Sequence, residues 1–252
     1  MSWMDRTPLS VLELGFFVIL LASVETGYRG YGRVKPKDGR QINGQEFLLS
    51  AAVGLLALLM GFTFSLSLSR YEARRALVVQ EANAIGTAWV GAQLVDEPYR
   101  GELSGLLKQY TDARVVWSDI SAPQDLGPTR TLQDRLSTAV QHLVRGGTDP
   151  SVVRWVLDPL NEAFGVQAAR TAARAARVPD RVLWVLMLYS VLSMVMLGYI
   201  LAINGHRHNA ATGLLLLLLT LAFGLILDLD RPNGGAILVS QRPLAEVRAS
   251  MR

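Results

Sequence analysis

The sequence predicts an all-α membrane protein with four transmembrane helices and a helical cytoplasmic insert between the second and third. Half of the 252 residues are apolar, and the mean hydropathy of the chain is positive, which is unusual for a soluble domain. Four apolar segments have about the 20 residues that a helix needs to cross a hydrocarbon core of ~30 Å. They are residues 9–28, 47–68, 182–203 and 210–227.

Charged residues distinguish these segments. The second and third segments carry none, whereas the first contains Glu13 and Glu25. Acids at membrane depth are costly unless they are paired, hydrated or near an interface. We therefore weigh interfacial positions for both against a Glu13 that pairs with a buried arginine or faces water. A cleaved secretory signal is the alternative for this segment, although Asp5 and Glu13 do not suit one.

The fourth segment ends at Asp228 and Asp230. Because the dipole at a helix C-terminus disfavours acids, we expect Arg231 or an arginine of another segment to compensate them.

The polar stretch between the second and third segments is long enough to fold as a domain. Within it, Thr131 and Asp134 form a candidate capping box before a helix, and Asp149 with Pro150 suits the start of the next. The sequence thus predicts four regions: residues 1–68 with two spans and a basic loop, 69–181 as the cytoplasmic helical domain, 182–231 with two more spans, and 232–252 as a cytoplasmic tail. Lysines and arginines near the membrane favour the side that holds the insert and both termini, which the positive-inside rule makes cytoplasmic.

Catalytic and metal-binding patterns are missing from the sequence. There is no cysteine and no phosphate-binding or nucleophile motif. The two histidines at His206 and His208 have no acidic or thiol residue beside them, so we favour a solvated loop over a metal site. We therefore expect neither an enzyme nor a cofactor, and no nucleic-acid partner.

One graded stripe follows the second span into the insert. Residues 61–89 contain no proline, so a single helix is expected to leave the bilayer there. At 100° per residue, one face collects apolar and small residues first and polar residues later: Gly54, Leu58, Gly61, Phe62, Ser65, Ser69, Glu72, Ala76, Asn83 and Thr87. The opposite face carries Thr63, Ser67, Arg70, Arg74 and Glu81. An apolar collar followed by hydrating groups suits a pore lining, whereas small residues also suit close helix packing in lipid.

Basic residues form a second pattern near the membrane. Arg170, Arg174 and Arg177 share one helix face, and Arg70 and Arg74 follow the second span. Such a juxtamembrane stripe contacts lipid headgroups in one interpretation and forms an anion-attracting vestibule in the other.

Three stretches resemble the bacterial bestrophin-like membrane proteins. They are "GFTFSLSLSRYEARRALVVQEANAIGTAW", "LDLDRPNGGAILVSQRPLAEVRAS" and "RVPDRVLW". Bestrophins, to which that family is distantly similar, are pentameric channels whose second helix lines the pore. The resemblance implies a homo-oligomer in the bacterial inner membrane with its apolar neck at Gly54, Leu58 and Phe62. No acidic cluster resembling the bestrophin calcium clasp is evident, so calcium gating is not implied.

The resulting prediction is a bestrophin-like ion channel that contacts lipids and permeant ions. Ser65, Ser69, Glu72 and Asn83 would line the mouth beyond the neck. The alternative is a non-conducting scaffold or regulatory protein whose helical domain binds a partner, and it expects the stripe to be buried between helices.

Overall fold

The structure confirms the all-α fold and its four candidate membrane spans. The computed structural model describes residues 7–34, 45–118, 126–205, 209–232 and 235–252, and these ranges contain helices and no strand. The predicted histidine loop, His206–His208, lies outside the described residues.

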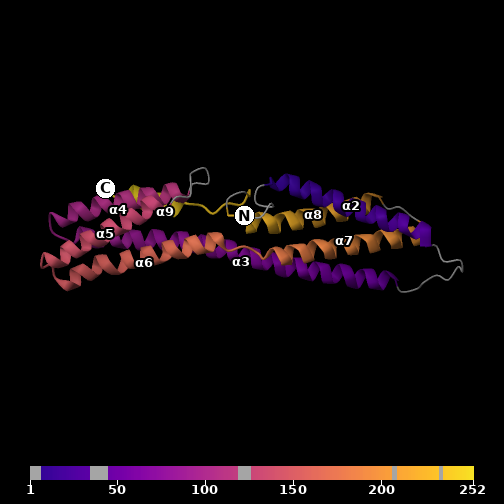
Figure 1. Ribbon diagram of the computed structural model, residues 1–252, viewed down its shortest axis with the longest axis horizontal. Helices are drawn as coiled ribbons and strands as arrows, with labels where there is room; N and C mark the ends of the chain where they lie inside the picture. The colour runs from indigo at the N-terminus through magenta and orange to yellow at the C-terminus, as the bar shows by residue number, and fades with distance from the viewer. Residues whose placement is uncertain (1–6, 35–44, 119–125, 206–208, 233–234) are drawn as a thin grey trace. The chain divides into compact units, whose positions relative to one another are not determined.

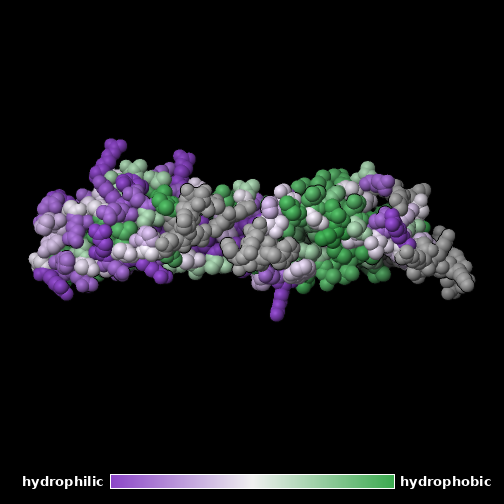
Figure 2. Space-filling view, turned by 45° about the horizontal axis from the view of Figure 1, so that its top comes forward, coloured by the Kyte–Doolittle hydropathy of each residue, from purple (hydrophilic) through white to green (hydrophobic). Residues whose placement is uncertain are grey.

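The chain folds as two compact units (Figure 1). The apolar unit comprises Met1–Tyr71 and Arg177–Leu238, and the polar unit comprises Glu72–Ala176 and Val239–Arg252. Figure 2 shows apolar side chains over the visible face of the first unit and mostly hydrophilic ones over that of the second. The apolar unit therefore has the surface of a membrane-embedded body, and the polar unit has that of a solvated one.

The apolar unit contains α2 (Leu9–Val34), the first part of α3 (Gln45–Gln93), α7 (Asp180–Ile203) and α8 (Asn209–Asp230). Helix α2 continues past residue 28, where the sequence predicted a loop. Glu25 and Arg29 form an ion pair of 2.7 Å one turn apart there, which supports the added turns. In the core, the Phe16 ring stacks on Phe223 with centroids 4.4 Å apart.

Two glycines allow α2 and α7 to approach closely. A Cβ on Gly27 would lie 1.9 Å from the Val195 carbonyl oxygen, and one on Gly198 would lie 1.9 Å from that of Val24. Neither position accepts a larger residue without movement of the backbone. Small residues at a contact of this kind let two membrane helices pack backbone to backbone.

Helix α3 is the longest element and contributes to both units. Its 49 residues lack proline, so no backbone donor is lost and no ring clashes with the preceding turn. The expectation of an unbroken helix through residues 61–89 is confirmed.

The polar unit is built from the second part of α3 with α4 (Tyr99–Ser118), α5 (Gly127–Arg145), α6 (Pro150–Ala175) and α9 (Arg242–Ser250). As predicted, Asp149 caps α6, and its carboxylate accepts a hydrogen bond of 2.7 Å from the Ser151 amide. The capping box predicted at Thr131 is wrong, because α5 begins earlier at Gly127. The Thr131 hydroxyl instead bonds to the Gly127 carbonyl within that helix.

The C-terminal segment packs inside the polar unit, a placement that the sequence did not predict. Leu244 of α9 is completely buried, and Met251 is nearly so. The Thr111 hydroxyl of α4 lies 3.7 Å from the Met251 sulfur. Arg248 donates two hydrogen bonds, of 2.5 and 3.0 Å, to the Asp112 carboxylate. Leu244 of α9 and Met251 just after it thus belong to the same hydrophobic core as buried residues of α3 to α6.

Candidate functional site

Within the apolar unit, one face of α3 packs into the protein. Leu56, Met60, Thr63 and Ser67 are buried on it. The Thr63 hydroxyl donates a 2.8 Å hydrogen bond to the Leu59 carbonyl of its own helix, which leaves its methyl group to pack. This face is therefore largely withdrawn from water and permeating ions in the folded protomer.

The opposite face of α3 is open in the protomer. Leu58 is 51% exposed and Phe62 is 65% exposed. A Cβ on Gly54 would meet no atom of the described residues within 4 Å. Ser65 and Ser69 are also exposed. At 100° per residue this open face lies roughly 180° from the buried one, so the residues predicted as a neck and inner mouth share a face that the protomer leaves uncovered.

The part of α3 in the polar unit has the same division. Val78, Glu81 and Ile85 are buried, whereas Glu72, Asn83 and Thr87 are exposed. Of the two polar faces recognised in the sequence, the one with Arg74 and Glu81 is used for packing within the protomer.

The predicted basic stripe is divided by the structure. Arg74 and Arg170 are buried, whereas Arg70, Arg174 and Arg177 are half-buried. The expected headgroup-facing or vestibule position is therefore corrected for Arg74 and Arg170. The physical reason for Arg170 is an acid in the core that binds its guanidinium.

That acid is Glu81, which lies at the centre of a buried polar cluster. Arg114 Nε lies 2.5 Å from Glu81 Oε1, and Arg170 binds the other carboxylate oxygen. Arg170 also donates a 2.9 Å hydrogen bond to Gln241 beside α9. The cluster joins α3, α4 and α6 to the C-terminal segment, because each member supplies a partner that a buried charge requires.

Arginines dominate the electrostatics around Glu81. Burial lowers the pKa of Arg170, an effect that Glu81 opposes. Burial also lowers the pKa of Arg174, and the charges of Arg170 and Arg114 lower it further. The interior of the polar unit thus concentrates positive charge around one carboxylate.

The acids that end α8 accept hydrogen bonds from backbone amides. Asp228 accepts hydrogen bonds from the amides of Ala236 (2.7 Å) and Ile237 (3.2 Å), and Asp230 accepts one from Val178 (2.8 Å). Arg231, expected as their compensating cation, donates to the Thr7 carbonyl at 3.0 Å. Backbone amides after α8 therefore bind Asp228, and an amide just before α7 binds Asp230.

Glu13 of α2 lies against α8. A Cβ on Gly224 would lie 2.1 Å from Glu13 Oε1, so the absence of a side chain there makes room for this acid. Among the described residues, Glu13 is half-buried and forms no ion pair, and no three histidine or acidic side chains converge into a metal site.

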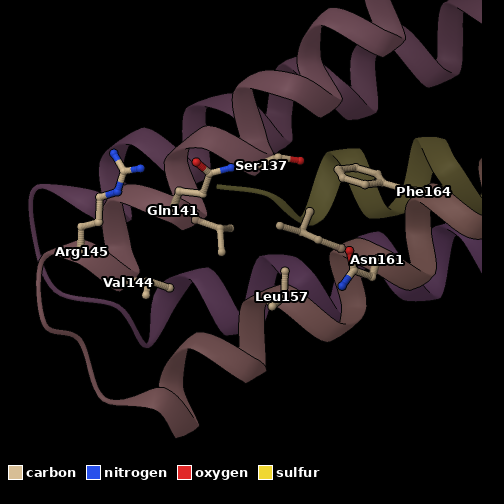
Figure 3. A pocket seen from close by; sticks show the side chains of 9 residues that line it. Ser137, Gln141, Val144, Arg145, Leu157, Asn161 and Phe164 are labelled. Atoms are coloured by element: carbon tan, nitrogen blue, oxygen red, sulfur yellow. The ribbon is translucent and has the colours of Figure 1, made fainter.

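A separate groove lies between α5 and α6 of the polar unit (Figure 3). Its volume is about 340 Å³, and Leu157 and Phe164 form part of its apolar wall. Its polar groups come from Ser137, Gln141, Arg145 and Asn161. No sequence motif marked this groove.

Comparison with known proteins places the chain in a family. A family model for the Bestrophin-like domain matches residues 16–244. The chain belongs to the bestrophin-like family. No curated protein matches the sequence of this bestrophin-like chain.

Solved structures share the fold of this bestrophin-like protein. A variant of a bacterial Bestrophin homolog from Klebsiella pneumoniae superimposes with a TM-score of 0.71 at 15% identity, covering 97% of this chain and 98% of that one. A second variant of the homolog gives 0.71 at 14% identity, with coverage of 97% and 99%. A structure described as a membrane protein gives 0.73 at 14% identity, with coverage of 94% and 97%.

The partners of Glu81 were not predicted from the sequence. In α4, Arg114 continues a stripe at helical spacing with Leu103, Leu107 and Tyr110, all of which are buried. An arginine on an apolar stripe indicates a buried cation that needs an acid. Glu81 falls between Val78 and Ile85 in the same way on α3.

Proposed function

We propose that this bestrophin-like protein is a homo-oligomeric ion channel of the bacterial inner membrane, lined by α3. The family resemblance implies five subunits. The polar unit and both termini would lie in the cytoplasm, following the distribution of basic residues. Within the predicted boundaries, residues 69–181 would form the cytoplasmic domain and 232–252 the tail.

The observation that carries the proposal is the open face of α3. One helix cannot enclose a path, so conduction requires several copies whose uncovered faces converge on an axis. The face that the protomer leaves available carries Leu58 and Phe62, followed by Ser65 and Ser69. Apolar side chains in a ring gate by dewetting, and the hydroxyls beyond them replace water around an ion.

The polar unit extends the same proposal. Glu72 and Asn83 are exposed on α3 beyond the span, where they would line a cytoplasmic mouth. Their backing is rigid, since the other face of this part of α3 is fixed by Glu81 and its two arginines. Lipid headgroups near Arg70, Arg174 and Arg177 are the remaining proposed contacts.

Measurement of ion flux tests the proposed channel directly. Purified full-length protein would be reconstituted into liposomes under a potassium chloride gradient, with separate readouts for the cation and the anion. Phe62→Ala should raise flux, because it removes the largest side chain of the proposed neck. Leu66→Ala is the matched control: Leu66 is an exposed apolar residue of α3 that lies about 90° from the centre of the lining face, and its truncation should leave flux unchanged.

Equal flux from wild-type and empty liposomes would contradict the channel and favour the non-conducting scaffold. If Phe62→Ala and Leu66→Ala changed flux equally, the protein would still conduct, but the face of α3 that carries Phe62 would not be the pore lining. An axial hole in images of the oligomer, bordered by α3, would support the proposed pore lining independently.

A further inference from the structure

We propose that a groove between α3 and α7 binds an anionic phospholipid, with one acyl chain in the groove and the headgroup phosphate on Arg181. The site lies within the apolar unit and does not depend on conduction. Six residues line the groove, which has a volume of about 240 Å³: Leu59, Thr63, Arg181, Val182, Val185 and Leu186.

The walls of this groove are suited to a hydrocarbon chain. Leu59 and Thr63 come from α3, and three aliphatic residues come from the first turns of α7. The Thr63 hydroxyl is already bonded to the Leu59 carbonyl. A ligand in the groove would therefore meet methyl and methylene groups along its length, with a single charged side chain among the lining residues.

That charged residue is Arg181, the second residue of α7. Its side chain is exposed, and among the described residues it has no hydrogen-bond or ion-pair partner. It precedes an uncharged run, residues 182–203, that is long enough to cross a bilayer. An arginine at the start of a span lies at headgroup level, where its planar guanidinium binds phosphate through paired hydrogen bonds.

Charge determines which lipid the groove prefers. Lipids with the same acyl chains make the same contacts with the groove, so the chain contributes no preference between their headgroups. A basic group at the surface contributes about 1 kcal/mol towards an anionic lipid, which corresponds to roughly fivefold in affinity. The groove therefore positions the chain, and Arg181 selects the negative headgroup.

Lipid titration with native mass spectrometry tests the proposal. The full chain in nonionic detergent would be titrated with phosphatidylglycerol and, separately, with phosphatidylcholine of the same chain length. Wild-type should retain phosphatidylglycerol about fivefold better. Arg181→Gln should abolish that preference while phosphatidylcholine still binds, and Val185→Trp should reduce retention of both lipids by filling the groove.

Two variants provide matched controls. Arg145→Gln removes an exposed arginine of the polar unit that has no partner among the described residues, and Leu192→Trp enlarges an α7 residue that is as exposed as Val185 (58% against 56%). Neither should change lipid retention. Millimolar inorganic phosphate should not displace phosphatidylglycerol, since it has no chain for the groove.

Four results would overturn the proposal. The first is an undiminished phosphatidylglycerol preference in Arg181→Gln. The second is equal retention by Val185→Trp and Leu192→Trp, and the third is displacement by inorganic phosphate alone. The fourth is a Val185→Trp protein that changes oligomeric mass but not lipid retention, because a second copy of the chain would then cover the groove.

Discussion

Arg114 donates a 2.5 Å hydrogen bond to Glu81, and both side chains are completely buried. Arg170 binds the same carboxylate, so two guanidinium groups share one acid inside the polar unit. Removing one partner of a buried ion pair leaves an uncompensated charge and costs about 3 to 5 kcal/mol. We expect Glu81→Gln to destabilise the polar unit by this amount, which thermal unfolding of the detergent-purified full chain would measure.

An exposed pair provides the control for Glu81→Gln. Glu97 accepts a 3.0 Å hydrogen bond from Arg100, and both are exposed to solvent that screens their attraction. Glu97→Gln should therefore leave the melting temperature nearly unchanged. Similar losses for both variants would mean that the buried cluster is no more important than a surface contact.

Sequence patterns predicted the membrane spans and the helix faces of this protein better than they predicted contacts between particular residues. Runs of uncharged apolar residues predicted the spans of α3, α7 and α8, because crossing a hydrocarbon core sets both composition and length. Helical phase predicted which residues of α3 share a face, but only the structure showed which face the protomer covers. That choice depends on the other helices packed against α3.

Contacts between distant segments were harder to predict. Nothing in the sequence paired Gln241 with Arg170, and the basic spacing of Arg170 and Arg174 matched a surface stripe. Periodicity places a residue on a face without showing what packs against it. For Arg170 the decisive information was Glu81, on a helix 89 residues away in the chain.

Packing of the C-terminal segment should contribute more to the stability of the polar unit than its surface ion pair does. Leu244 is completely buried, and truncation of a buried leucine costs about 2 to 5 kcal/mol. Arg248 and Asp112 are partly exposed to solvent, which weakens their pair. Thermal unfolding should therefore show a larger loss for Leu244→Ala than for Arg248→Gln. The reverse order would indicate that α9 is held by charge.

Alkaline pH should destabilise the polar unit through Tyr110. Burial raises the pKa of Tyr110, the charge of Glu81 raises it further, and the charges of Arg114 and Arg170 oppose this. The folded state thus keeps the phenolic proton after the unfolded chain, with a pKa of about 10, has lost it. The stabilising contribution is complete below about pH 10 and is lost as pH rises above that value.

Tyr110→Phe should accordingly reduce the loss of stability between about pH 9 and about pH 11. Chemical denaturation at several pH values would measure it, with Tyr99→Phe, a half-buried tyrosine at the start of α4, as control. Parallel pH profiles for wild-type and Tyr110→Phe would refute the assignment.

Close packing of α2 on α7 gives the sharpest test of the apolar unit. Gly198→Ala would place a methyl group 1.9 Å from the Val24 carbonyl oxygen, and a helix backbone cannot move aside as a flexible side chain can. Overpacking of this kind costs about 1 to 3 kcal/mol, so the melting temperature in detergent should fall. Gly15→Ala, also in a membrane helix, meets no described atom within 4 Å and should be neutral or mildly stabilising, because alanine favours the helix over glycine. If Gly198→Ala matched Gly15→Ala, the two helices would have to lie farther apart than this structure places them.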